Sequence, residues 1–197
     1  MRRRTFDALM VVAGLALTAI LVVAGVLLLW GNSFANSQVR SQLAAQKIVF
    51  PTTSNAEFKA LPKSDQAAMK VYAGQEMLTG AQAQTYADHF IAVHLQEIGG
   101  GLTYSQLSAK SMAQPNNAKL AGQVATVFKG TTLRSMLLTA YAFWKLGEIA
   151  LISAIVSFIG AAVMLVLSLA GVWHLRRVPE DAEVFSKVGH HATVQTA

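Results

Sequence analysis

The feature that most constrains this chain is an uncharged, mostly apolar run at residues 149–172, IALISAIVSFIGAAVMLVLSLAGV. A second run of the same kind lies near the start, at residues 8–30. Each is roughly 23 or 24 residues long, and about 20 apolar residues suffice for an α-helix to cross the hydrocarbon core of a bilayer. Because lipid offers the backbone no hydrogen-bonding partner, each run must be helical. The sequence therefore predicts two transmembrane helices.

The composition agrees with this division of the chain. Of the 197 residues, 53% are hydrophobic and 13% are charged, with the apolar excess concentrated in the two runs. The segment between them has the size of one small domain. We expect a basic N-terminal segment, a first transmembrane helix, a helical domain, a second transmembrane helix and a disordered tail, at residues 1–7, 8–30, 31–148, 149–173 and 174–197.

Basic residues flank the two runs asymmetrically. Residues 2–4 are all arginine, and Arg176 and Arg177 follow the second run, whereas Lys145 is the one basic residue close to a run on the other side. Because cytoplasmic flanks carry the excess of Lys and Arg, we expect both termini to be cytoplasmic. The protein is then a multi-pass protein of the plasma membrane, with residues 31–148 extracytoplasmic.

The first run has an alternative interpretation as a secretory signal. Small residues at Ser33 and Ala35 offer a possible cleavage site. However, the apolar core of a signal peptide is typically about 7–15 residues, which is shorter than residues 8–30. We therefore expect an uncleaved transmembrane helix, with cleavage as the open alternative.

Small residues recur on one face of each run. Since steps of three or four residues return to the same face of a helix, the pattern predicts a helix–helix seam, within the chain or between copies. The alternative is that such residues are simply common in membrane helices. The predicted seam residues are Gly14, Thr18, Leu21 and Gly25 in the first run and Ala150, Ser153, Ala154, Ser157 and Ala161 in the second.

The segment between the runs is expected to be helical. We predict that the first helix continues to about Lys47, that residues 52–63 form a loop, and that Ser64 caps a short helix. The best-marked helix follows Thr79 and carries an apolar stripe at helical spacing. The stripe consists of Ala83, Tyr86, Ala87, Phe90, Ile91, His94, Leu95 and Ile98.

Turn and capping residues divide the rest of this segment. Glycines at 99–101 should end the striped helix, and Thr103 with Gln106 matches a capping box for a short helix. After a turn at residues 115–117, we expect a helix that ends at Gly130 and a last helix capped by Thr131 or Thr132. The predicted fold is an all-α membrane protein, with two transmembrane helices flanking an extracytoplasmic, four-helix-like bundle domain.

The polar residues do not meet the requirements of a catalytic, cofactor or metal site. His94 and Glu97 share a helix face, but a di-metal bundle needs two Glu-x-x-His pairs, and this single pair has the reverse order. Asp88 and His89 point about 100° apart on a helix, and no glycine-flanked serine elbow accompanies the candidate nucleophiles. Those candidates are Ser105 and Ser108. We therefore predict no catalytic residues, no cofactor and no metal site, and expect that the protein is not an enzyme.

Other candidate features have ordinary structural interpretations. Glycines 99–101 follow a helix and lack the lysine of a phosphate-binding loop, and His190 with His191 is at most a weak metal ligand in the tail. Lys145 and Glu148 form a boundary pair at the second run. The chain has no cysteine. Its net charge is +6, but the basic residues are scattered, so we expect no nucleic-acid partner.

Several short segments are distinctive, namely the arginine-rich start, AQKIVFP at 45–51, YADHFIA at 86–92, AYAFW at 140–144 and Trp173-His174. Together they resemble a group of uncharacterised two-span membrane proteins of actinobacteria, and the resemblance covers residues 1 to about 177. Some members carry the label "aromatic ring-opening dioxygenase", but the histidines and acids here lack a metal-binding arrangement for that chemistry. The resemblance implies a two-span topology and an envelope location.

These observations favour a non-catalytic envelope protein with a structural or accessory role. Its external helical domain would bind a protein partner or a second copy, and the lipid bilayer would surround the two spans. The alternative is a ligand-sensing or small-molecule-binding module, which requires an apolar pocket near Phe90, His94 and Tyr104. A membrane hydrolase that relies on His89 or Ser105 is a third hypothesis.

Overall fold

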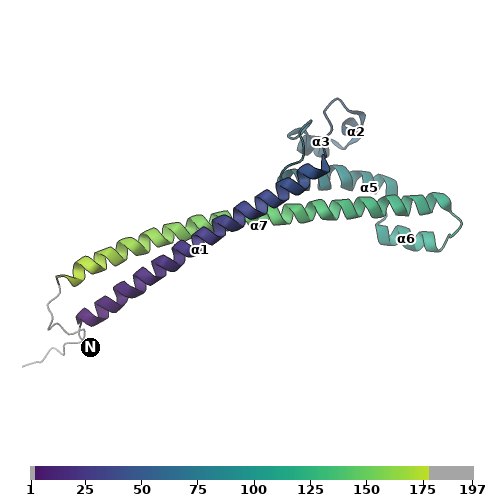
Figure 1. Ribbon diagram of the computed structural model, residues 1–197. Coiled ribbons are helices and arrows are strands. Elements are labelled where there is room, and N and C mark those ends of the chain that lie inside the picture. The colour runs from purple at the N-terminus through teal and green to yellow at the C-terminus, as the bar shows by residue number, and fades with distance from the viewer. Residues whose placement is uncertain (1–2, 178–197) are drawn as a thin grey trace, which may run out of the picture. The chain divides into compact units, whose positions relative to one another are not determined.

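A computed structural model describes residues 3–177, and residues 1, 2 and 178–197 lie outside the described part (Figure 1). The predicted disordered tail falls mostly outside it. Within residues 3–177 every regular element is a helix, which confirms the all-α prediction. The helices are α1 (Arg3–Gln46), α2 (Ala56–Ala60), α3 (Lys63–Lys70), α4 (Gly80–Tyr86), the π-helical turn η1 (Ala87–Ile91), α5 (Ala92–Gly99), α6 (Tyr104–Met112) and α7 (Ala118–Leu175).

The described helices form two compact units. The paired-helix unit contains residues 3–29 and 152–177, and the multi-helix unit is Trp30–Leu151. Helices α1 and α7 contribute to both units. By length and composition α1 and α7 could each cross a membrane, which suggests a membrane protein.

In the paired-helix unit, α1 and α7 pack antiparallel through small residues. Gly14 lies against Ser168 and Gly25 lies against the Phe158 ring. The Ser157 hydroxyl donates a hydrogen bond of 2.9 Å to the Leu21 carbonyl oxygen across the seam. The predicted seam is therefore confirmed within the chain.

The seam on α7 differs in detail from the prediction. Ala154, Ser157 and Ala161 are buried as expected, while Ala150 and Ser153 are only partly buried and Ser168 joins the seam. The large apolar side chains of this unit mostly point outward and are exposed. Exposing this much apolar surface to water would be unfavourable, whereas the hydrocarbon chains of a bilayer solvate it without that cost.

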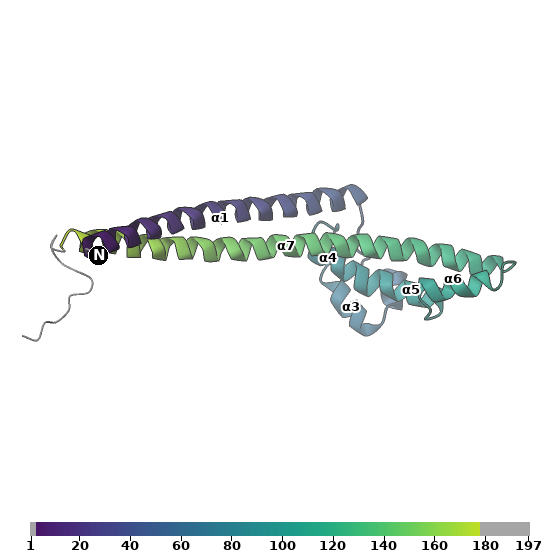
Figure 2. The ribbon, with the colours of Figure 1, turned by 90° about the horizontal axis from the view of Figure 1, so that it is seen from below.

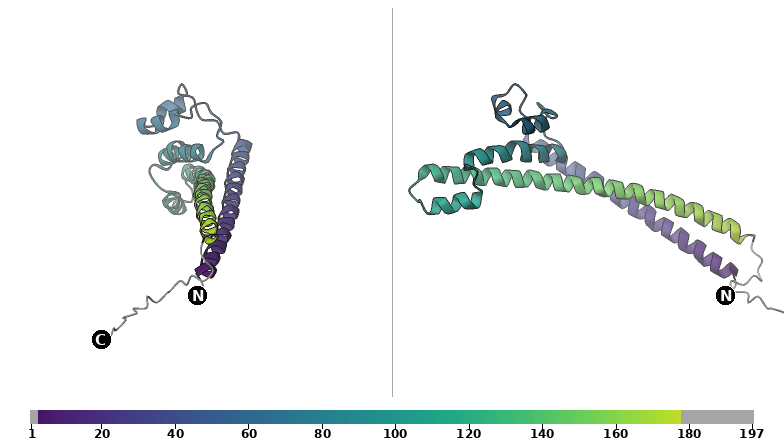
Figure 3. Two further views of the ribbon diagram at one scale, coloured as in Figure 1. Left: turned by 90° about the vertical axis from the view of Figure 1, so that its left-hand side faces the viewer. Right: turned by 180° about the vertical axis from the view of Figure 1, so that it is seen from behind.

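The multi-helix unit is built around residues 118–151 of α7. A nearly continuous helix formed by α4, η1 and α5 packs antiparallel along it, with Gly80 opposite Trp144 and Leu95 over Gly130. Figure 2 shows α5 alongside α7, and Figure 3 shows the α4–η1–α5 helix between α3 and α7. The main core of this unit consists of Val39, Leu43, Phe50, Phe58, Leu61, Met69, Met77, Ala83, Ala87, Ile91 and Leu137.

Two predicted features of residues 48–64 change in the structure. The predicted loop contains the short helix α2, because Phe58 on that turn is buried against the core, 5% exposed. Helix α3 begins at Lys63 with Pro62 as its N-cap, so the predicted cap at Ser64 is wrong. Because proline has no backbone N–H, Pro62 adds no unsatisfied donor at the start of α3.

The predicted helix break at Gly130 is also wrong, since α7 continues through it. A Cβ at this position would lie 2.5 Å from Leu95 Cδ2, so the glycine serves close helix packing rather than termination. Thr132 does not cap a helix, because its hydroxyl donates to the Phe128 carbonyl oxygen at 2.9 Å inside α7.

The other predicted helix ends are confirmed. Helix α1 stops at Gln46 and α5 is followed by Gly100 and Gly101, both with positive φ. The Thr103–Gln106 capping box is present at α6. A second capping box, between Thr79 and Gln82 at α4, was not predicted.

Two glycine substitutions in the multi-helix unit should have opposite effects on its stability. In Gly80→Ala the new methyl group meets the Cβ of Trp144, and such overpacking typically costs about 1–3 kcal/mol. In Gly122→Ala the methyl group meets nothing within 4 Å, so the better helix propensity of alanine should stabilise by up to about 1 kcal/mol. Thermal unfolding in detergent measures both, and equal shifts of one sign would contradict the packing described.

Candidate functional site

A large apolar hollow of the multi-helix unit lies between α1 and α7, and we call it the α1–α7 groove. It has a volume of about 750 Å³, within the usual range of about 300–1,000 Å³ for ligand sites. It is lined by Phe34, Ala35, Gln38, Val39, Gln42, Leu43, Gln46 and Ile48, and by Leu133, Ser135, Met136, Leu137, Thr139, Ala140 and Phe143.

Helical spacing produces this groove from two rows of residues on α1. Phe34, Gln38, Gln42 and Gln46 follow one another at steps of four, and a second row begins at Ala35. Because residues four apart share a helix face, both rows turn towards α7. At 1.5 Å per residue, the lined part of α1 is about 18 Å long.

The floor and the rim of the groove differ in exposure. Val39, Leu43 and Leu137 form a buried floor, between 3% and 6% exposed. Three large side chains of the rim are more than half exposed, namely Phe34 at 54%, Met136 at 65% and Phe143 at 58%. The rim therefore presents apolar surface that nothing in the described chain covers.

The polar groups of the groove are all uncharged. Among the described residues that line it, the polar side chains are amides and hydroxyls, and no Asp, Glu, Lys, Arg or His is present. Arg40 of α1 and Lys47, which follows the last residue of α1, are outside the lining. The groove thus offers hydrogen bonds and apolar contact, without a general acid, a general base or an ion-pair partner.

A smaller pocket of about 330 Å³ lies between the α4–η1–α5 helix and α7, and we call it the aromatic pocket. The Phe90 ring packs on Tyr86 and His94, with centroid distances of 4.7 and 4.4 Å. A pocket is therefore present near Phe90 and His94, where the ligand-binding alternative requires one. Tyr104 does not line it and instead packs on Phe128, at 5.3 Å.

His94 has a clear structural partner in this pocket. Its Nδ1 lies 2.8 Å from the Phe90 carbonyl oxygen, and since a carbonyl oxygen only accepts, Nδ1 carries the proton. The described part of the chain contains no group of three or more His, Cys, Asp or Glu side chains that could hold a metal ion. His94 thus covers a backbone carbonyl beside the π-helical turn.

The adjacent residues Asp88 and His89 bind two different elements. The Asp88 carboxylate pairs with Arg134 of α7 at 2.7 Å, and the Arg134 Nε also donates to the Ala87 carbonyl oxygen. The His89 Nδ1 lies 2.7 Å from a carboxylate oxygen of Asp65 on α3. The two side chains therefore connect η1 to its neighbours rather than facing a common substrate.

The remaining candidate residues are not assembled into a site. Ser105 and Ser108 lie on α6, and within residues 3–177 neither forms a hydrogen bond with Asp88 or His89. Lys145 and Glu148 pair at 2.7 Å, and this hydrogen bond raises the pKa of the Lys145 ammonium group. His190 and His191 lie outside the described residues.

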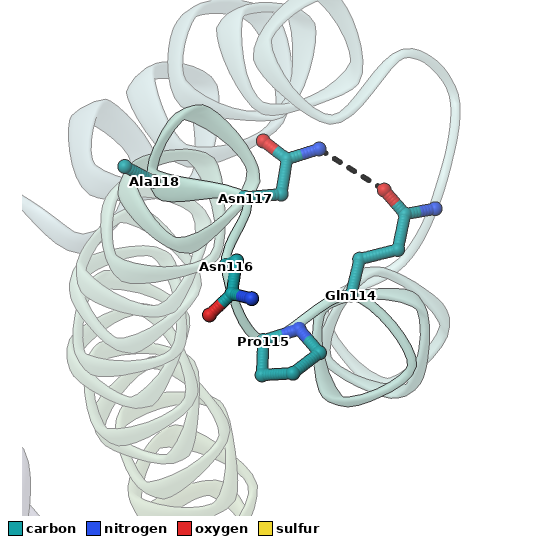
Figure 4. A pocket seen from close by; sticks show the side chains of 5 residues that line it. All are labelled: Gln114, Pro115, Asn116, Asn117 and Ala118. Atoms are coloured by element: carbon teal, nitrogen blue, oxygen red, sulfur yellow. Dashed lines mark hydrogen bonds between the residues drawn. The ribbon is translucent and has the colours of Figure 1, made fainter.

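A polar hollow lies at the turn between α6 and α7, and a side chain that lines it caps the start of α7. Figure 4 shows the Asn117 side-chain amide donating to the Gln114 oxygen, a bond of 3.0 Å. The Asn117 oxygen in turn accepts from the Leu120 backbone N–H at 3.1 Å. Asn117 thereby satisfies a free amide at the start of α7, so these polar groups are already occupied.

Comparison with protein-family models, with curated proteins and with solved structures finds no match to this chain. The aromatic pocket lies where the ligand-binding alternative requires one, whereas the α1–α7 groove was not predicted from the sequence. The available signal was the row of glutamines at steps of four from Gln38 to Gln46, opposite the apolar face of α7.

Alkaline pH should weaken the fold through Tyr86. Burial, with a smaller contribution from Glu57, raises the pKa of the Tyr86 phenol above its ordinary value of 10.0. The unfolded chain therefore loses this proton at a lower pH than the folded chain does. The contribution of Tyr86 to the free energy of unfolding is fully present well below pH 10 and declines as the pH rises beyond it. Urea unfolding between about pH 9 and 11 should show a shallower decline for Tyr86→Phe than for the wild type. Tyr104→Phe, outside the pocket, is the control, and an unchanged decline in Tyr86→Phe would contradict this account.

Proposed function

We propose that this chain is a non-catalytic integral membrane protein of the cell envelope with a structural or accessory role. Its multi-helix unit binds a protein partner through the α1–α7 groove. The observation that carries the proposal is the groove itself, an uncharged trough whose rim exposes Phe34, Met136 and Phe143.

The membrane location is supported by the two long apolar helices and the basic residues that flank them. Helices α1 and α7 could each cross a bilayer, and the arginines at 2–4, 176 and 177 favour cytoplasmic termini under the positive-inside rule. In this proposal the multi-helix unit is an extracytoplasmic helical bundle in contact with the plasma membrane.

The energetics favour a macromolecular partner for the groove. Burying one large apolar side chain contributes roughly 1.5–3 kcal/mol, and a few such anchors carry most of the binding energy of an interface. Phe34, Met136 and Phe143 are anchors of this kind, and the floor below them is preformed by packed core residues. Because no titratable group among the described residues lines the groove, it is suited to binding rather than to acid–base chemistry.

A ligand-sensing module is the second candidate, and the aromatic pocket favours it. The rings of Tyr86, Phe90 and His94 pack on one another at interplanar angles of 34° and 44° and give that pocket an aromatic wall, which suits a small apolar or aromatic molecule. A concentration-dependent rise in melting temperature with such a compound, absent in a Phe90→Ala variant, would support this function. No shift across a broad panel of apolar compounds would count against it.

Affinity purification from native membranes tests the leading proposal. The wild-type chain, tagged at its C-terminus and extracted in mild detergent, should carry a defined protein partner. Met136→Glu places a charge in the groove and should lower partner recovery at least tenfold, since an unpaired charge in an apolar interface costs more than about 1.4 kcal/mol.

Met112→Glu is the matched control for this experiment. Met112 is the same residue type and is even more exposed, at 74%, but it lies at the end of α6 outside the groove. Its partner recovery should equal that of the wild type. Equal recovery with Met136→Glu, or equal loss with both variants, would rule out the groove as the binding site.

A further inference from the structure

We propose that the partner in the α1–α7 groove is a second copy of this chain, in a two-fold dimer that joins the two grooves face to face. The inference rests on the proposed function, because it identifies the protein that the groove binds. Three observations support it: the charge, the shape and the direction of the two lining helices.

The first observation is that the charge of the groove allows two identical grooves to meet. A two-fold interface places the same surface patch on both subunits, so a patch with charges of one sign repels its own copy. The chain as a whole has a net charge of +6, yet none of the described lining residues is charged. This surface of the multi-helix unit can therefore meet its copy without like-charge repulsion.

The second observation is that the groove carries both knobs and holes. Phe34, Met136 and Phe143 project from the rim, while the floor between the helices is recessed and buried. In packed helices, side chains of one helix insert into the spaces between side chains of the next. The rim of each copy can fill the groove of the other, which removes the exposed apolar surface of both at once.

The third observation is that α1 and α7 run in opposite directions along the groove. Gly147 of α7 contacts Ala35 at one end of the groove, and Leu133 and Gln46 line the other end. A two-fold axis parallel to the helices then places α1 of each copy beside α7 of the other, with antiparallel neighbours throughout. The result is a four-helix arrangement at the interface.

The uncharged polar groups also fit a symmetric contact. Gln38, Gln42 and Gln46 form a row along the rim of α1, and each side-chain amide both donates and accepts hydrogen bonds. Such a row can pair with hydroxyl or amide groups of an identical surface. Anchoring in one membrane holds two copies in the same orientation and raises their effective concentration.

The mass of the intact assembly in mild detergent tests this inference. Native mass spectrometry should give a dimer for the wild type and for Met112→Glu, and a monomer for Met136→Glu, with at least a tenfold weaker dimer dissociation constant. Met136 is 65% exposed in the single chain, so the charge stays solvated in the monomer. A wild-type helical circular dichroism spectrum for Met136→Glu excludes unfolding as the cause.

Cross-linking provides a second measurement, which does not need a substitution that breaks the dimer interface. The chain has no cysteine, so a single introduced thiol reacts alone with a bifunctional maleimide. Gln38→Cys lies in the groove, and Ser37→Cys is its neighbour, about 100° around α1, exposed and outside the lining. Cross-linked dimers should form in native membranes with Gln38→Cys and be at least tenfold rarer with Ser37→Cys.

The outcomes separate this inference from the proposed function. A wild-type dimer that persists in Met136→Glu, or equal cross-linking at both cysteines, overturns the inference. So does a wild-type monomer, with or without a retained lipid mass. If that monomer binds a different identified protein, and Met136→Glu loses it while Met112→Glu keeps it, the proposed function stands alone. If Met136→Glu binds the same proteins as the wild type, both the inference and the proposed function are wrong.

Discussion

The close approach of the α4–η1–α5 helix to α7 is the contact on which the rest of the multi-helix unit depends. Two glycines permit it, one on each helix: Gly80 lies against Trp144, and Gly130 lies under Leu95. A side chain at either position would push the helices apart. Their contact allows Ala83, Ala87 and Leu137 to join one core with Val39 and Leu43 of α1. That core forms the floor of the α1–α7 groove.

The π-helical turn is the second constraint in this region. At Ala87–Ile91 the backbone hydrogen bonds of the helix join residues five apart instead of four, so the helix is wider there. Polar contacts stabilise this turn on both sides. Arg134 binds Asp88 and the Ala87 carbonyl oxygen, Asp65 binds His89, and His94 covers the Phe90 carbonyl oxygen. Turns of this type often occur at functional sites. Here the side chains of Asp88, His89 and His94 are engaged in positioning the helix.

Local signals in the sequence predicted much of this structure. The striped helix, the glycines at 100 and 101, the Thr103 capping box and the seam through Gly14 and Gly25 all depend on interactions within a few residues or on one repeated face. The failures depend on contacts distant in sequence. Gly130 looks like a helix stop until Leu95 occupies the space beside it. Helix α2 exists because the core buries Phe58.

The candidate site was predictable only in part, for the same reason. The ligand-binding alternative required a pocket near Phe90, His94 and Tyr104, and the residues of this pocket on one helix could be named because that helix supplies most of its wall. The α1–α7 groove forms only when two segments separated by about ninety residues lie side by side. No local sequence pattern shows that these segments are neighbours in space. Tyr104 was assigned to the wrong site because its helix α6 packs on α7 elsewhere, with its ring on Phe128.

The central claim of this account is that α1 and α7 both cross the membrane, with the multi-helix unit on the outside. Labelling single-cysteine variants in intact cells with a membrane-impermeant maleimide tests it most directly, because the chain has no cysteine of its own. Ser64→Cys, exposed on α3, should be labelled in intact cells. Thr5→Cys and Ser186→Cys should be labelled only after the membrane is opened. Labelling of Ser186→Cys from outside, or protection of Ser64→Cys, would contradict the two-span topology.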